Sequence, residues 1–90
     1  MRFRFLELCH DKIFLLGYEL KLSPTEERLL RAVAYGGKSD IDTLCLILRD
    51  GVGRGNVAVH INGINKKAAK ISGRKLIIHK DSRYILNPYM

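Results

Sequence analysis

The segment Ser23-Pro24-Thr25-Glu26 constrains the fold of this chain most, because it combines three signals for the start of a helix. Serine suits the N-cap position, proline suits the first helical position, and a glutamate three residues after the serine completes a capping box. The apolar residues that follow recur at helical spacing; they are Leu29, Leu30, Val33 and Ala34. Because Gly36-Gly37 is a typical C-terminal stop, the sequence predicts a helix over residues 24–35.

The chain before this helix contains three short apolar runs, at residues 3–6, 13–16 and 18–22. His10-Asp11 and Gly17 separate them. Short apolar runs that are broken by turn-forming residues are typical of strands. We therefore expect a small antiparallel sheet of two or three strands at the N-terminus.

Two further helices are predicted after residue 35. The second is short, its first residue is left open by the pattern, and its apolar residues are Ile41, Leu44, Cys45 and Leu48. Asp40 and Asp42 lie at its start, and we interpret them as capping and first-turn carboxylates instead of a metal or acid pair. Glycines at positions 51, 53 and 55 then break the chain. A third helix is expected over residues 56–71, ending near Ser72-Gly73.

The last predicted element is a β-hairpin. Leu76-Ile77-Ile78 and Tyr84-Ile85-Leu86 flank a polar, cationic tip over residues 79–83. The order of elements is therefore sheet, three helices and hairpin, without an internal repeat or a linker. Since ninety residues support one hydrophobic core, we expect a single α+β domain over residues 1–90.

Membrane, metal and enzyme classes are disfavoured by the sequence. The longest stretch without a charged residue, 55–65, is too short to span a membrane, and Glu7 interrupts the N-terminus before a signal peptide could form. Cys9 and Cys45 lack the spacing of a zinc site, and we interpret them as free, mostly buried thiols. We expect a cytoplasmic protein that is not an enzyme and that needs no metal and no cofactor.

Positive charge is concentrated late in the chain. The protein has 16 Lys and Arg against 9 Asp and Glu, which gives a formal net charge of +7. Residues 1–50 are balanced, whereas residues 51–90 contain eight basic side chains and one carboxylate, Asp81. Such a field is the expected footprint of a nucleic-acid site, because each neutralised phosphate releases condensed counterions. The alternatives are a solvated basic surface that aids solubility and one that rests on anionic lipid.

The third helix is predicted to have one apolar stripe and one polar face. At about 100° per residue, the stripe consists of Val57, Ile61, Ile64 and Ala68. Opposite it fall Val59, Asn62, Gly63, Lys66 and Lys70, with His60 and Lys67 on one flank and Asn65 and Ala69 on the other. A face with Asn, Lys and a small apolar residue suits the major groove of DNA, because amides pair with adenine and lysines with guanine or phosphate. A solvated helix face is the alternative.

The hairpin tip offers a second cationic element. Lys80 and Arg83 bracket the turn, where they could enter a minor groove or bind the flanking sugar–phosphate backbone. A solvent-exposed turn without function is the alternative. His60 is interpreted either as a donor to phosphate or as a residue at the boundary of the core.

Three segments resemble the OmpR/PhoB-type winged helix-turn-helix family, the effector domain of many bacterial response regulators and of ToxR- and CadC-like activators. Residues 22–30 resemble the family's L-T-P-T-E-x-x-L-L segment at the start of helix one. Residues 57–67 resemble its recognition helix V-D-V-H-I-x-R-L-R-x-K, and residues 84–86 resemble the closing G-Y-R-L of the wing. The resemblance covers Leu6 to Leu86. It implies a winged helix-turn-helix with an N-terminal antiparallel sheet, three helices and a C-terminal β-hairpin wing.

The resemblance also implies how DNA would be bound. The recognition helix would lie in the major groove, the wing arginine would reach the minor groove, and two copies would form a homodimer on direct repeats. These roles pass to Val59, His60, Lys66, Lys67, Lys80 and Arg83. Because the matching region begins within the first few residues, we expect no receiver domain before it and no phosphorylation control of the usual kind.

The chain departs from the family pattern at four positions. Ala58, Gly63 and Asn65 replace an aspartate and two arginines, and Arg83 replaces the glycine before the wing tyrosine. An arginine missing at Gly63 would remove a guanine contact worth about 1–3 kcal/mol. We expect Asn62 and Lys66 to take over base contacts.

These observations predict a transcription regulator that binds double-stranded DNA sequence-specifically. The predicted contact residues are Arg54, Asn56, Val59, His60, Asn62, Lys66, Lys67, Lys70, Arg74, Lys80 and Arg83. The alternative is a winged-helix interaction module that docks on RNA polymerase or on another regulator, with weak or no DNA reading. Gly63 and Asn65 are the sequence features that favour this alternative.

Overall fold

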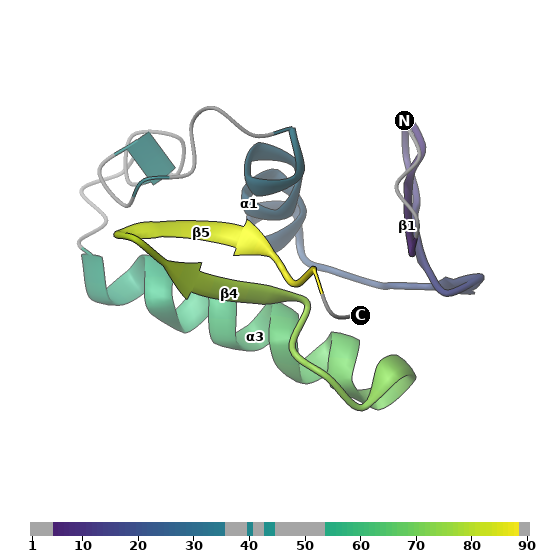
Figure 1. Ribbon diagram of the computed structural model, residues 1–90. Helices are drawn as coiled ribbons and strands as arrows, with labels where there is room; N and C mark the ends of the chain where they lie inside the picture. Colours follow the sequence, from purple (N-terminus) through teal and green to yellow (C-terminus); the bar gives the residue numbers. More distant parts are fainter. Residues whose placement is uncertain (1–4, 36–39, 41–42, 45–53, 89–90) are drawn as a thin grey trace.

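The computed structural model describes residues 5–35, 40, 43–44 and 54–88, which form an α+β arrangement of a sheet, two helices and a hairpin (Figure 1). The N-terminal sheet is antiparallel, with β1 (Leu6–Leu8), β2 (Ile13–Leu15) and β3 (Tyr18–Glu19) in that order. Side chains alternate between the two faces, and the leucines and isoleucine of β1 and β2 are buried. The predicted N-terminal sheet is confirmed, with three strands.

The helix α1 (Pro24–Ala34) begins at the predicted capping box. Ser23 accepts a hydrogen bond from the Glu26 backbone N–H (3.2 Å), and the Glu26 carboxylate accepts one from the Ser23 N–H (3.0 Å). The buried residues of α1 include Leu29, Leu30 and Val33, as the helical spacing predicted. The predicted start and core face of this helix are confirmed, whereas its glycine stop, Gly36-Gly37, lies outside the described residues.

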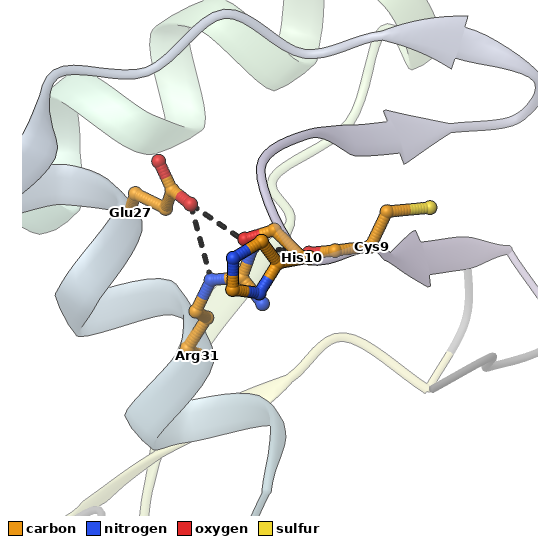
Figure 2. Close-up of polar contacts among 4 residues, drawn as sticks. All are labelled: Cys9, His10, Glu27 and Arg31. Atoms are coloured by element: carbon orange, nitrogen blue, oxygen red, sulfur yellow. Dashed lines mark hydrogen bonds and ion pairs between the residues drawn. The ribbon is translucent and has the colours of Figure 1, made fainter.

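Arg31 attaches α1 to the N-terminal sheet, as Figure 2 shows. Its guanidinium donates to the backbone carbonyls of Cys9 and His10, in the turn that joins β1 to β2. The same guanidinium pairs with Glu27 one turn earlier on α1, at 2.9 Å. The Cys9 thiol is free and half-buried, and Cys45 lies outside the described residues.

The predicted second helix is described at its start alone. Thr43 and Leu44 are helical, and the remaining residues between 41 and 53 lie outside the described part of the chain. The Asp40 carboxylate accepts hydrogen bonds from the Thr43 backbone N–H (3.1 Å) and hydroxyl (2.8 Å). These bonds lower the pKa of Asp40 below its ordinary value. The capping interpretation of Asp40 is confirmed.

The helix α3 (Arg54–Ser72) is followed by the hairpin of β4 (Ile77–Lys80) and β5 (Arg83–Leu86). Gly73 terminates α3 with a φ of 74°, as predicted, and α3 begins two residues earlier than expected. The helix packs against α1, β4 packs against α3, and β5 packs against α1. Because β4 runs back along α3, the turn of the hairpin lies near the end where α3 begins (Figure 1).

The core lies between the sheet, the two helices and the hairpin. From α3 it takes Val57, Ile61, Ile64 and Ala68, which are the four residues of the predicted stripe. Leucines of β1, β2 and α1 meet them, together with Leu44, Leu76 and Ile77. Neither described helix combines the length and the apolar character that crossing a bilayer requires.

Candidate nucleic-acid interface

One side of α3 is turned to solvent and carries four of the predicted contact residues. We call Val59, Asn62, Lys66 and Lys70 the exposed stripe, since all four are exposed and recur every three or four residues. Val59 shows 65% of its surface although it is apolar. Within the described part of the chain, no carboxylate pairs with Lys66 or Lys70. The two lysines are therefore available to pair with an external partner.

The hairpin tip carries a second pair of cations. Lys80 and Arg83 are cross-strand partners, and both are exposed. The turn between them places Asp81 and Ser82 at φ values of 52° and 63°. Two residues at positive φ form the tight type I′ turn that matches the twist of a hairpin, although neither is glycine. Two like charges directly opposite each other are unfavourable for the strand pair itself.

The face of the hairpin that carries Lys80 and Arg83 is the one turned away from the core. Side chains alternate along a strand, and Ile77 is buried while Leu86 packs against the core. Lys80 and Arg83 stand an odd number of residues away, so they project on the opposite face. The backbone of Arg83 also bridges to Asp40. The cations of the tip therefore form a group separate from the exposed stripe.

An open cleft of about 440 Å³ separates the exposed stripe from β4. Its lining is Ile61, Asn62, Asn65, Lys75, Ile77, Ile78, His79 and Tyr84. The rings of His79 and Tyr84 pair across the strands with their centroids 5.0 Å apart. The sequence assigned no role to His79 or Lys75. The hairpin prediction could have placed His79 beside Tyr84, but nothing in the sequence placed either of them beside Asn62.

Asn65 is not on an outward flank as predicted, because it is 9% exposed and bonded to the hairpin. Its amide oxygen accepts from the Ile77 backbone N–H at 2.8 Å, and its amide nitrogen donates to the Ile77 carbonyl at 3.0 Å. The side chain thus pairs with the edge of β4 in the way that a neighbouring strand would. The family has an arginine where this chain has Asn65. In this fold, an arginine at position 65 would have to fit into the packed site between α3 and β4.

Gly63 is half-buried and lies beside α1. A Cβ at this position would fall inside contact distance of the Glu26 Oε2 atom on α1, so the glycine leaves room for the Glu26 carboxylate. That Gly63 marks a missing guanine contact stays a prediction; in this backbone its side-chain position points to the Glu26 carboxylate of α1.

Lys67, a predicted contact residue, is paired inside the protein. Its ammonium donates to the Glu26 carboxylate, whose residue is 7% exposed. Burial by itself would raise the pKa of Glu26, but the hydrogen bonds from Lys67 and Ser23 and the charge of Lys67 outweigh it. The pKa of Glu26 therefore lies below the ordinary glutamate value. The charge of Lys67 is thus paired within the protein. No such pair is formed by its neighbour Lys66 among the described residues.

The other predicted contact residues lie at the margins of this surface. His60 is half-buried on α3. Arg54 and Asn56 lie in the first turn of α3, and their side chains lie outside what is described. Arg74 follows the end of α3, where its backbone N–H and carbonyl both bond to the Ser72 hydroxyl. The described residues contain no group of three His, Cys, Asp or Glu that could bind a metal ion.

Comparisons with protein-family models, with curated proteins and with solved structures found no match. The likeness to the OmpR/PhoB-type family is therefore a prediction from the residues of this chain.

Proposed function

We propose that this protein binds double-stranded DNA as a winged helix-turn-helix transcription regulator. In this proposal α3 lies in the major groove, and the β4–β5 hairpin contacts the minor groove or the flanking backbone. The observation that carries the proposal is the unpaired cationic exposed stripe on α3, beside a hairpin whose tip holds two more exposed cations. Along residues 54–88 the single carboxylate is Asp81. Two further carboxylates approach this surface from other elements: Asp40 lies beside Arg83, and Glu26 is paired with Lys67.

The chemistry of the exposed stripe supports DNA over a general polyanion. The Asn62 amide can both donate to and accept from an adenine edge, and the exposed Val59 suits a thymine methyl group. Lys66 and Lys70 can reach guanine or phosphate from the same side of the helix. A surface that served solubility alone would gain nothing from an exposed valine at one end of the stripe.

The packing of α3 also supports the proposal. Both flanks of the exposed stripe are anchored, one by Asn65 on β4 and the other by Lys67 on α1. A helix held on both sides presents its remaining face as a rigid surface, which lowers the entropic cost of binding. Gly63 and Asn65, which favoured the protein-docking alternative in the sequence, have contacts within the fold that also account for them.

The test compares two pairs of charge reversals on labelled random duplex DNA. K66E/K70E alters the exposed stripe, and K12E/K21E makes the same change of net charge at two exposed lysines near the N-terminal sheet. We expect the parent to bind with a strong salt dependence. If Lys66, Lys70, Lys80 and Arg83 each neutralise one phosphate, log affinity falls by about 3.6 per tenfold rise in salt.

K66E/K70E should bind much more weakly and lose about 1.8 from that slope, while K12E/K21E should bind nearly as the parent does. Equal losses in the two variants would indicate unspecific attraction. A parent that fails to retard duplex DNA at low salt would refute the proposal and favour the docking module. Selection of bound sequences from a random duplex library would then test whether binding is sequence-specific.

A further inference from the structure

The Glu26 carboxylate connects three parts of the molecule. Its Oε1 atom accepts the Ser23 N–H at the start of α1 and the Lys67 ammonium from α3. Its Oε2 atom occupies the space over Gly63, one helical turn before Lys67. Glu26 therefore caps one helix and contacts the next with the same group.

The balance of charge favours this contact. A buried carboxylate is stabilised by a nearby cation, and it loses that stabilisation when the cation leaves. Lys67 is the cation that pairs with Glu26 among the described residues, and its side chain is 41% exposed. A Lys67 that turned to a phosphate would leave the buried Glu26 carboxylate without its cation, with the Ser23 N–H still bonded to it. Lys67 is therefore a poor phosphate ligand, although it is adjacent to Lys66.

Gly63 makes the contact possible. Glycine is disfavoured inside helices, and at this position a side chain would displace the carboxylate. Gly63, Lys67 and Glu26 thus form one interhelical contact, which we call the Glu26 contact. On the other flank of α3, Asn65 is bonded to β4. Lys66 lies between these two anchored residues in the sequence, and its side chain is the one turned to solvent.

We infer that Glu26 and Lys67 are positioning residues of the DNA-binding surface. The buried apolar stripe decides which face of α3 lies inward, and the Glu26 contact holds the α1 flank of the helix, so that the exposed stripe is presented as a rigid surface. This inference rests on the proposed function, and it removes Lys67 from the residues that touch DNA.

The test uses three variants. A change of charge and a loss of the Glu26 contact have different expected effects on DNA affinity or on its salt dependence. E26Q keeps the capping hydrogen bond, because glutamine also serves in a capping box, and removes one negative charge near the surface. K67M removes the lysine and keeps much of its length. K66M is the matched control on the exposed stripe, one residue away. Affinity for duplex DNA is measured against salt, at a temperature where circular dichroism shows each variant folded.

We expect E26Q to bind DNA several-fold more weakly than the parent, although simple electrostatics would strengthen binding. K67M should also bind more weakly but keep the salt slope of the parent, whereas K66M should lose about 0.9 from it. The double variant E26Q/K67M should bind no more weakly than K67M, since both changes break the same contact.

An E26Q protein that binds DNA as well as or better than the parent would overturn the inference. So would a K67M protein whose salt slope falls as much as that of K66M, since Lys67 would then contact phosphate directly. A different result would refute the proposed function: a parent protein that does not bind duplex DNA at all.

Discussion

The two flanks of α3 are held by different kinds of interaction. Toward the hairpin, the neutral Asn65 amide satisfies both the N–H and the carbonyl of Ile77 and is buried. Toward α1, the charged Lys67 pairs with Glu26 and remains half-exposed. A buried neutral amide keeps its hydrogen bonds at any salt concentration and any ordinary pH. A half-exposed ion pair contributes little and depends on both. The hairpin side should therefore be the firmer anchor.

The largest expected effect is on the hairpin side. N65A leaves the Ile77 N–H and carbonyl without partners in a buried site, so the free energy of unfolding should fall by about 2–4 kcal/mol. N62A makes the same chemical change on the exposed stripe, and it should alter stability by less than about 0.5 kcal/mol. Chemical denaturation of both variants checks the difference. Equal losses would show that the Asn65 bonds add nothing to the anchor.

The next effect concerns the α1 side and its dependence on pH. The folded-state pKa of Glu26 is depressed, so the carboxylate contributes stability above its unfolded pKa of about 4.3. That stability is lost as the pH falls through the lower folded value. E26Q should cost about 1 kcal/mol at pH 7 and nearly nothing at strongly acidic pH. Unfolding curves from pH 7 to pH 2 measure it.

The same pH series on N65A should run parallel to the parent, because that side chain does not titrate. An E26Q loss that stays constant across the series would contradict the charge-based account of the α1 side.

A smaller effect tests why Gly63 is a glycine. G63A normally stabilises a helix by about 1 kcal/mol, but here the new Cβ must displace the Glu26 carboxylate. We expect G63A to give no gain in the parent and to recover much of that 1 kcal/mol in an E26A background. A thermal-unfolding cycle over the parent, the two single variants and the double variant measures the coupling. Additive effects would show that Glu26 does not restrict position 63.

The smallest effect strengthens the hairpin side alone. Ser82 has a φ of 63°, a conformation that glycine adopts at no steric cost. S82G creates Asp-Gly, which type I′ turns favour, and we expect about 0.5 kcal/mol of added stability. The gain should appear equally in an E26Q background, since the α1 side is untouched. DNA affinity should keep its salt slope, because Lys80 and Arg83 remain in place.

The turn that joins β2 to β3 shows how far residue types alone can predict a tight turn in this chain. It uses the same pair of positive φ angles, 52° at Leu16 and 85° at Gly17. There the glycine was visible as a turn signal in the sequence. At the hairpin tip no glycine stands, and the turn was predicted from the two flanking apolar runs. The chain pattern therefore located both turns, while the strain at Ser82 required the backbone.

The face of α3 was predicted well where a single neighbour, the hydrophobic core, covers it. It was predicted less well at the positions that lie beside α1 or β4. Val57, Ile61, Ile64 and Ala68 form a stripe because one core covers them. Asn65 and Gly63 were placed outward or near it, and the structure buries the first and turns the second to α1. Periodicity gives each residue an angle about the helix axis, but it does not say how wide an arc the neighbours cover.

The sequence by itself determined the local features of this protein: the capped start of α1, the core stripe of α3, the hairpin and the concentration of positive charge after residue 50. These depend on backbone hydrogen bonding, side-chain period and composition, which act over a few residues. Only the tertiary structure decided which lysine of the pair Lys66 and Lys67 stays free. That choice depends on a carboxylate about forty residues away in the chain, and such distant contacts leave no periodic trace near the residues that they pair.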